Sequence, residues 1–209
     1  MIEIIGAPQS VYVRTVRMAL EEKSVSYVLT AAAPHSSDVR AINPFGKIPA
    51  MRHGAFELFE SKAIATYVDL VFAGPRLVPE DAKLAARTEQ WISAINTSVF
   101  PRVVGYMQAN AFAKDGQPDR ATIQEMLPGV RATIEIVGRA VEPSGHLVDD
   151  NFTLADVFLM PILAYLRMFP DSAGIMRSIP ALGVYFDRHA RRLSFVATTP
   201  PPLSALNRA

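Results

Sequence analysis

Along the first third of the chain, short segments with the apolar pattern of a strand alternate with segments that have the apolar spacing of a helix. Residues 2–5 (IEII) form a short apolar run typical of a strand, and residues 11–23 place apolar side chains among charged ones at the spacing of an amphipathic helix. The elements expected after these are a strand at 26–30, a hairpin of strands 48–52 and 55–59 around His53 and Gly54, and a helix at about 60–72. The pattern therefore predicts the order strand, helix, strand, connector, strand, strand, helix.

The remainder of the chain has almost only helical periodicity. Residues 74–83 (GPRLVPEDAK) are rich in proline and charge and are typical of a linker. Beyond it, proline and glycine separate the expected helices, which are about 83–113, 119–141, 154–168, 174–177 and 180–192, and residues 198–203 (TTPPPL) are expected to be extended. We expect an α/β domain with a mixed sheet and the order of the thioredoxin fold at 1–76, followed by an all-α helical bundle domain at 83–209.

Composition and charge exclude several classes of function. The chain has 209 residues, of which 50% are hydrophobic, so it can bury a sizeable core. A net charge of +1 provides no basic surface for phosphates, so nucleic acid is not an expected partner. No segment has the ~18 uncharged apolar residues of a membrane span, and the first residues lack the pattern of a signal peptide. These features predict a soluble cytoplasmic protein without a membrane partner.

The chain contains no cysteine, which excludes disulfides, thiolate metal sites and a cysteine nucleophile. Thiol chemistry would therefore need a thiol that arrives with a substrate. The four histidines, at positions 35, 53, 146 and 189, do not have the spacing of a metal site, and we expect no metal.

Three short motifs are candidates for a binding site. Residues 6–10 (GAPQS) lead from the first strand into the first helix, where Ser10 is also suited to be a simple N-cap. Residues 43–51 (NPFGKIPAM) place Lys47, Ile48 and Pro49 just before a strand, which could equally be an ordinary loop. Glu60 and Ser61 open a helix, whose N-terminal N–H groups and positive dipole end suit a carboxylate, although such a pair is often only a cap.

Together, in this order and spacing, the motifs resemble the glutathione-binding half of the cytosolic glutathione transferases, and the resemblance covers nearly the whole chain. The nearest type is the serine-using one, Phi-like or a related bacterial class. The resemblance implies that glutathione is the co-substrate and that Ser10 donates a hydrogen bond to its thiolate. A free thiol with a pKa near ~8.5 is only about 3% ionised at pH 7, and lowering its pKa by two units takes about 2.7 kcal/mol. Tyr12 is the second candidate for this role, or a wall of the substrate pocket.

The resemblance also assigns the other ends of glutathione. It implies a cis Ile48–Pro49 bond, with the backbone of Ile48 pairing with the cysteinyl part of the ligand. Lys47, and with less support His35, would bind the glycyl carboxylate. Ser61 would bind the γ-glutamyl carboxylate, and Glu60 would orient that end or meet the ammonium group.

An electrophile pocket is expected between the two domains, facing Ser10. Its candidate residues are Tyr12, Arg102, Val103, Tyr106, Met107, Asn110, Tyr165 and Phe169. Side chains of these types at helical spacing are more often core than pocket, and Arg102 and Tyr106 are the polar members that could orient a leaving group. The resemblance further implies a homodimer and a hydrophobic electrophilic small molecule as substrate.

Two alternatives share this fold: a glutathione-dependent peroxidase that uses the same site, and a non-catalytic glutathione-binding or interaction module. The sequence lacks the serine-cysteine signature of the maleylacetoacetate isomerases. It also has Arg192-Leu193 where many members have arginine-proline. A further family-like segment, residues 149–163 (DDNFTLADVFLMPIL), predicts a capping box in which Asp156 reaches back to Thr153, with a structural role.

Overall fold

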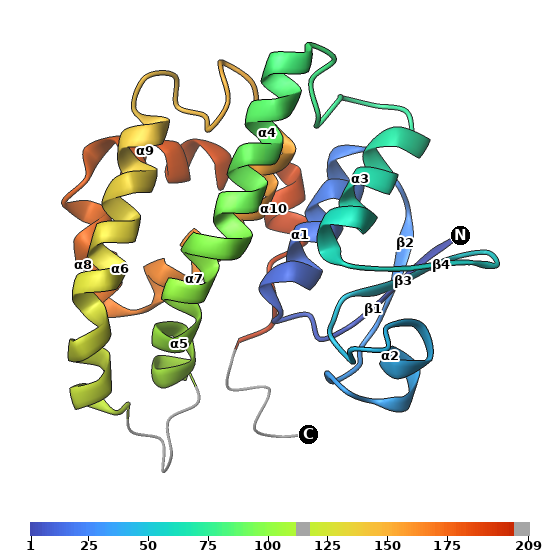
Figure 1. The fold of residues 1–209 in the computed structure, drawn as a ribbon, viewed down its shortest axis with the longest axis horizontal. Coiled ribbons are helices and arrows are strands. Elements are labelled where there is room, and N and C mark those ends of the chain that lie inside the picture. The colour runs from blue at the N-terminus through green and yellow to red at the C-terminus, as the bar shows by residue number, and fades with distance from the viewer. Residues whose placement is uncertain (112–117, 203–209) are drawn as a thin grey trace. The chain divides into compact units, whose positions relative to one another are not determined.

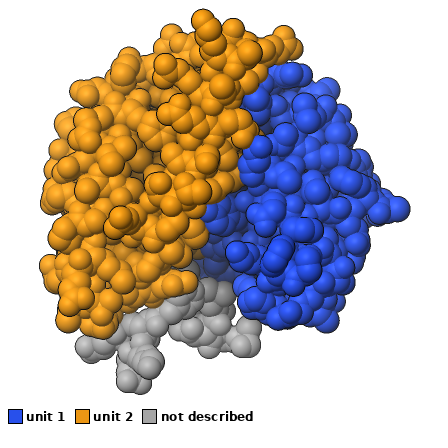
Figure 2. Space-filling view, viewed as in Figure 1, with its two compact units in different colours: residues 1–78, 191–209 blue, residues 79–190 orange. Residues whose placement is uncertain are grey.

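The computed structural model describes residues 1–111 and 118–202, and it divides into two compact units (Figures 1 and 2). Of the described residues, 1–78 and 191–202 form unit 1, and 79–111 and 118–190 form unit 2. The expected division placed the whole end of the chain in the helical part. Residues 191–202 instead belong to the unit that contains the sheet, because they pack against its first helix.

Unit 1 is built on a four-stranded mixed sheet. Its strands are β1 (Ile2–Ile5), β2 (Tyr27–Thr30), β3 (Ala50–His53) and β4 (Phe56–Phe59), in the order β2-β1-β3-β4. β1 runs parallel to β2 and antiparallel to β3, and β3 and β4 form the expected hairpin. A parallel pair followed by an antiparallel hairpin confirms the predicted thioredoxin-like fold class.

Ile2, Ile4 and Ile5 of β1 are buried, with Ile5 on the opposite face from the other two, so both faces of the sheet need cover from helices, while Glu3 stays partly exposed. α1 (Val11–Glu22) and α3 (Ser61–Val71) pack against each other (Figure 1). α2 (Ser37–Ile42) contributes Val39 and Ile42 to a separate small core with Ile5. The sequence pattern predicted α1 and α3 but left α2 as a connector, since six residues are too few to show a helical period.

A second short helix of unit 1 was also not predicted. The helix expected at 180–192 ends at His189, and α10 (Leu193–Ala197) follows after Arg192, whose backbone is extended. α10 packs on α1. The sequence between the two helices contains no proline or glycine, so no local signal marked the break.

Unit 2 is helical throughout its regular structure. Its elements are α4 (Ala82–Ala94), η1 (Ile95–Val99), α5 (Phe100–Ala111), α6 (Arg120–Val141), α7 (Leu154–Met168), α8 (Pro170–Arg177) and α9 (Pro180–His189). The expected helix at 83–113 is continuous through a π-helical turn, in which the Phe100 N–H bonds to the Ile95 carbonyl. The next residue, Pro101, has no N–H to donate. The helical hydrogen-bond pattern therefore changes at a position where proline already removes one bond. Residues 112 and 113 of the expected helix lie outside the described residues.

The buried helix α7 organises the core of unit 2, and the predicted capping box at its start is confirmed. The Asp156 carboxylate accepts hydrogen bonds from the Thr153 N–H at 2.8 Å and from the Thr153 hydroxyl at 3.0 Å. It also accepts the Leu147 N–H at 3.0 Å and the Tyr185 hydroxyl at 2.9 Å. In the described part of the chain, no helix is both long and apolar enough to cross a membrane.

Candidate functional site

Ser10 is the N-cap of α1, as the simplest interpretation of the sequence predicted. Its hydroxyl oxygen accepts the Val13 N–H at 3.4 Å, and its carbonyl accepts the Arg14 N–H at 2.9 Å. A serine hydroxyl has one proton and two lone pairs, so accepting the cap bond leaves its proton available. The hydroxyl donates this proton to none of the described residues. Capping and donation to a ligand are therefore compatible roles for Ser10.

The turn that carries Ser10 lies directly against the loop of the second motif. A Cβ atom placed on Gly6 would be 2.6 Å from Val13 Cγ2 and 3.1 Å from Ile48 Cβ, so only glycine allows this approach. The Ile48–Pro49 bond is cis, as the resemblance implied. The first turn of α1 and Ile48 thus both lie against Gly6, although they are far apart in the sequence.

Asn43 holds the loop in front of Ile48. Its side-chain nitrogen donates to the Lys47 carbonyl at 2.7 Å, and its side-chain oxygen accepts the Phe45 N–H at 3.0 Å. Its own carbonyl accepts the Gly46 N–H at 2.8 Å. Asn43 itself is almost fully buried at 1% exposure, and its bonds define the conformation of the loop. Sequence reasoning missed this residue, for which the Asn-Pro pair was the available signal.

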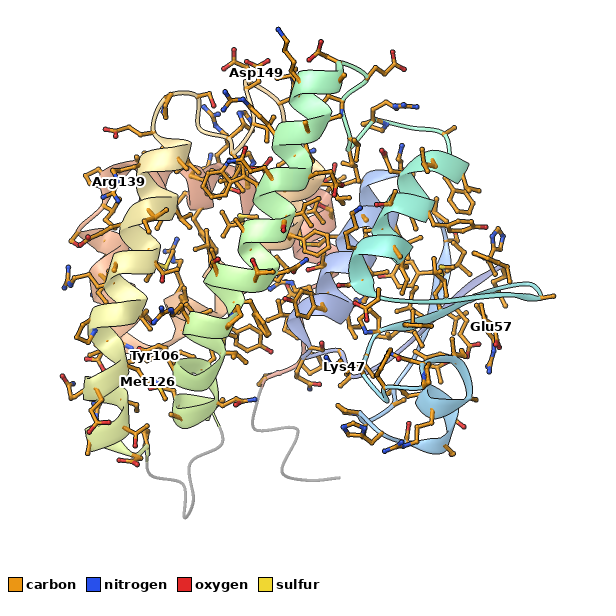
Figure 3. All side chains as sticks on the ribbon, viewed as in Figure 1. Lys47, Glu57, Tyr106, Met126, Arg139 and Asp149 are labelled. Atoms are coloured by element: carbon orange, nitrogen blue, oxygen red, sulfur yellow. The ribbon has the colours of Figure 1, made fainter. Side chains whose placement is uncertain are left out.

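Cationic and titratable side chains gather at this loop. The His35 N–H donates to the Gly46 carbonyl at 2.8 Å, which places His35 against the residue before Lys47. Arg40 Nε donates to the His35 carbonyl at 3.1 Å, and another Arg40 nitrogen is 3.4 Å from His35 Nδ1. Lys47 is exposed on the same loop (Figure 3). The structure therefore brings His35 and Lys47 to one loop and adds Arg40, which the sequence did not indicate.

The start of α3 has the geometry of an anion site. Ser61 is the first helical residue, Glu60 precedes it, and no described side chain caps the helix. The first N–H groups of a helix have no partner within it, and the positive end of the dipole lies there. Glu60 has a φ of 70°, a conformation that costs a non-glycine residue about 1–3 kcal/mol and that clusters at ligand sites. The alternative that Glu60 and Ser61 form only a side-chain cap does not hold.

Tyr12 lies within electrostatic range of Glu60. Burial, and secondarily the negative charge of Glu60, raise the pKa of Tyr12 to about 12. Its phenol is therefore protonated at every pH at which the protein would work. Tyr12 can act near the start of α3 as a hydrogen-bond donor or as an apolar wall, but it cannot serve as a base.

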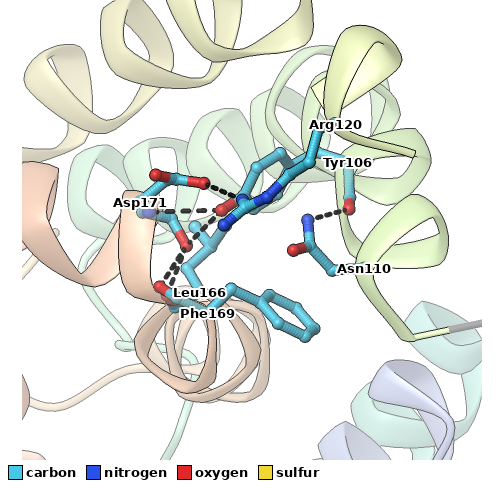
Figure 4. Close-up of polar contacts among 7 residues, drawn as sticks. Tyr106, Asn110, Arg120, Leu166, Phe169 and Asp171 are labelled. Carbon is cyan, nitrogen blue, oxygen red and sulfur yellow. Dashed lines mark hydrogen bonds and ion pairs between the residues drawn. The ribbon is translucent and has the colours of Figure 1, made fainter. Parts of the chain in front are cut away.

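The candidate Tyr106 lies in the interior of unit 2. Its hydroxyl donates to the Ser172 hydroxyl at 3.1 Å and accepts the Ser172 N–H at 3.2 Å, while the Ser172 hydroxyl donates to the Leu166 carbonyl (Figure 4). The Tyr106 ring meets Phe169 edge-on at 6.0 Å. Tyr106 has no exposed surface, so its hydroxyl is engaged in the core instead of facing a surface that a substrate could reach.

The other pocket candidates of unit 2 differ in how much of each residue is exposed to solvent. Val103, Met107, Tyr165 and Phe169 are buried, and Arg102 is exposed. The Asn110 amide donates to the Tyr106 carbonyl at 2.9 Å (Figure 4). A surface cavity of about 400 Å³ in this unit is lined by none of them but by Gln124, Leu127, Pro128, Arg131, Asp171 and Ile175.

Comparison with known proteins bears on both units. The family described as "Glutathione S-transferase, N-terminal domain" matches residues 4–76, and "Glutathione S-transferase, C-terminal domain" matches residues 103–192. The chain belongs to the glutathione S-transferase family of enzymes. It is 29% identical to glutathione S-transferase 3 of Zea mays over 220 residues, which cover 98% of each chain.

Solved structures agree with this assignment. The apo form of glutathione S-transferase III has a TM-score of 0.84 and 27% identity over 96% of this chain and 99% of the other. Glutathione transferase F7 of Populus trichocarpa has a TM-score of 0.86 and 24% identity over 95% and 97%, and it supports the fold. Among the described residues no group of three histidines or carboxylates could hold a metal ion.

The candidate site residues of unit 1 come from four separate segments of the chain. Ser10 and Tyr12 lie on α1, His35 and Arg40 around α2, Lys47 and Ile48 before β3, and Glu60 and Ser61 at the start of α3. The structure brings these segments to one end of the sheet through the close approach at Gly6, the bond from His35 to Gly46 and the charge interaction between Glu60 and Tyr12.

Proposed function

We propose that this protein binds glutathione in unit 1, lowers the pKa of its thiol beside Ser10, and transfers the thiolate to an electrophilic carbon. The observation that carries the proposal is the geometry of Ser10. Its hydroxyl oxygen accepts the Val13 N–H at the start of α1 and keeps its own proton, at a turn that lies against Ile48. In this reaction the thiol proton leaves to solvent, and the sulfur lone pair forms the new carbon–sulfur bond while the electrophile takes up the displaced electron pair.

Three groups would hold glutathione along the end of the sheet. The N–H and carbonyl of Ile48 would pair with the cysteinyl residue as a short added strand, next to Pro49. Lys47, with His35 and Arg40 behind it, would attract the glycyl carboxylate. The free N–H groups and hydroxyl at Ser61 would bind the γ-glutamyl carboxylate at the start of α3.

The ionisation of the thiol needs a modest amount of energy. A depression of two pKa units corresponds to about 2.7 kcal/mol. One hydrogen bond to a charged group supplies about 1.5–3 kcal/mol, and the positive end of a helix adds about 0.3–1 kcal/mol. Ser10 stands at the N-terminus of α1, so both contributions act at the same atom.

Tyr12 is the other residue that could supply the hydrogen bond to the thiolate. Its raised pKa of about 12, caused by burial and then by the charge of Glu60, keeps the proton on the phenol, and the effect of Glu60 indicates that Tyr12 lies near the start of α3. We assign Tyr12 to the wall of the site and the activation to Ser10. The active form proposed here is a homodimer.

The decisive experiment compares two serines that cap helices in the same way. Ser36 caps α2 through a bond from the Val39 N–H at 3.5 Å, as Ser10 caps α1. Ser10→Ala and Ser36→Ala should each lower stability by about 1 kcal/mol. Only Ser10→Ala should lower kcat/KM for glutathione with chlorodinitrobenzene, by about 100-fold.

Equal turnover of both variants would refute the assignment of Ser10. Binding is tested separately with Ser61→Ala, which should lower the affinity for glutathione by about 10-fold, as measured by calorimetry. An unchanged affinity would refute the carboxylate site at α3. If the unsubstituted protein binds glutathione but shows no transfer to an electrophile, peroxide turnover at the same site or the binding-module alternative takes the place of transfer.

A further inference from the structure

α1 carries a buried positive charge one turn after Ser10. The Arg14 side chain is only 3% exposed, although arginine is rarely buried without partners. One of its terminal nitrogens donates to the Phe195 carbonyl at 3.0 Å, and its Nε is 3.5 Å from the Thr198 hydroxyl oxygen. Its guanidinium also stacks 4.0 Å above the Phe195 ring. Every one of these partners lies in or directly after α10.

α10 depends on these contacts for its existence. A helix of five residues does not form on its own in water, because nucleation is unfavourable and few bonds repay it. Arg14 and Arg17 donate to the Phe195 and Ala197 carbonyls, which lie in its last turn, where two cations also meet the negative end of the helix dipole. The C-terminal turn of α10 is therefore bound to α1 at Arg14 and Arg17.

The other end of α10 is bound to the last turn of α1. Arg192 forms two hydrogen bonds of 2.7 Å with the Glu22 carboxylate, and Ser194 donates to the same carboxylate. The two arginine contacts, Arg14 at one end and Arg192 at the other, join the same pair of helices. They differ in their distance along α1 from Ser10: Arg14 is one turn away, and Glu22 is at the opposite end of the helix.

We propose that Arg14 is a positioning residue, which fixes the first turn of α1, and with it the direction of the Ser10 hydroxyl, by anchoring that turn to α10. This inference rests on the proposed function. Side chains of a helix lean toward its N-terminus, so Arg14 covers the turn that contains Ser10. The Arg14 N–H also closes that turn by donating to the Ser10 carbonyl at 2.9 Å.

An anchor is needed at this position because the cap itself is weak. The bond from the Val13 N–H to the Ser10 hydroxyl is 3.4 Å, longer than a good hydrogen bond. A hydroxyl that must meet a sulfur atom tolerates little displacement, since the strength of the bond depends on distance and angle. The planar guanidinium of Arg14, stacked on Phe195, holds the turn in place, which the cap bond alone would not do.

The test compares Arg14→Met with Arg192→Met in the full chain. Each variant removes one arginine from the contact between α1 and α10, so both should lower the melting temperature. With glutathione bound, thiolate absorbance across pH should give a thiol pKa about one unit higher in Arg14→Met than in the unsubstituted protein, and an unchanged value in Arg192→Met. In Arg14→Met, kcat with chlorodinitrobenzene at pH 6.5 should fall about 10-fold, while KM for glutathione should change less than about 3-fold.

A second readout does not depend on glutathione chemistry. Hydrogen exchange of the amides at positions 13 and 14 should accelerate by about 10-fold or more in Arg14→Met and by less than about 2-fold in Arg192→Met. If Arg14→Met does not fold, Phe195→Ala removes the stacking partner from the side of α10 and should shift the thiol pKa and the exchange in the same directions. Arg14→Lys keeps the charge but loses the fork, so it should resemble Arg14→Met.

Each outcome bears on one of the two claims. An unchanged thiol pKa and unchanged exchange in Arg14→Met, with only a lower melting temperature, would overturn the positioning role. Full recovery of the thiol pKa in Arg14→Lys would also overturn it, because charge alone would then suffice. If the pKa of the thiol of bound glutathione stays near ~8.5 in the unsubstituted protein, the proposed function fails. The hydrogen-exchange data then still decide whether Arg14 holds the first turn of α1.

Discussion

The two units use their polar side chains in different ways. In unit 2, the polar residues that the sequence singled out make their hydrogen bonds within the core. The Tyr106 hydroxyl is paired with Ser172, and the Asp156 carboxylate accepts four hydrogen bonds. In unit 1, the start of α3 has no side-chain cap from the described residues, and the Ser10 hydroxyl accepts a bond without donating one to any of them. The comparison teaches that a residue type indicates chemistry only where the local structure leaves hydrogen-bonding capacity.

The largest expected effect is on stability and lies in unit 2. Asp156→Ala removes the acceptor of four hydrogen bonds and leaves buried donors without partners, so it should lower the free energy of unfolding by about 3–5 kcal/mol. Urea denaturation measures this. Asp187→Ala is the control, because its ion pair with Arg167 is exposed and should contribute little. Similar losses in the two variants would mean that the Asp156 network is not the main polar element of this core.

The next effect concerns a buried ion pair in unit 1. Lys23 and Asp69 form an ion pair of 2.8 Å with side-chain exposures of 1% and 2%, and Asp69 also accepts the Leu77 and Val78 N–H groups. Lys23→Met should therefore cost about 3 kcal/mol, since a buried carboxylate would lose its counter-ion. Thermal and urea unfolding of Arg52→Met, which loses exposed pairs, should show a much smaller change. A Lys23→Met protein as stable as Arg52→Met would contradict this account.

Tyr106→Phe sharpens the comparison at the level of single groups. The change removes one hydrogen bond donated to Ser172 and one accepted from it, so we expect a loss of about 1–2 kcal/mol in unfolding free energy. Its measurement pairs urea denaturation with steady-state turnover at a temperature where the variant is fully folded. Catalytic efficiency should then be nearly unchanged. A loss of about 10-fold or more would mean that the Tyr106 hydroxyl does act in the substrate pocket.

The smallest effect is a dependence of stability on pH from unit 2. Burial is the main cause that lowers the pKa of His146 below its usual 6.5, and nearby Arg188 acts in the same direction, while Asp156 opposes it. Below pH 6.5 the unfolded chain takes up a proton that the folded protein resists, so stability falls as pH decreases until the folded pKa is reached. Chemical denaturation between pH 8 and pH 5 should show this decrease, and His146→Gln should reduce it. A steeper decrease in the variant would reverse the assigned sign.

Local patterns predicted much of this fold. The apolar run of β1, the period of α1 and α3 and the capping box at Thr153 are properties of neighbouring residues, and all are present in the structure. α2 and α10 were missed because each is shorter than the window in which a period can be seen. α10 exists through contacts with Arg14 and Glu22, which are more than 160 positions away in the sequence.

The candidate site was predictable to a similar extent. Motif resemblance indicated Ser10, Ile48 and Ser61, because each is tied to a turn or helix start that the sequence marks. Arg40 could not be found, since its importance lies in a bond to the His35 carbonyl. Asn43 was missed although the Asn-Pro pair marks a turn, because its bond to the Lys47 carbonyl is visible only in the folded loop. Tyr106 was a candidate by type and spacing, and its pairing with Ser172 depends on packing between distant helices.

The central claim is that Ser10 ionises bound glutathione, and thiolate absorbance across pH tests it most directly. The unsubstituted protein and Ser36→Ala should both hold the thiol of bound glutathione at a pKa about two units below ~8.5, and Ser10→Ala should return it toward that value while glutathione still binds. A depressed pKa that persists in Ser10→Ala would contradict the account and transfer the role to Tyr12 or to a backbone N–H.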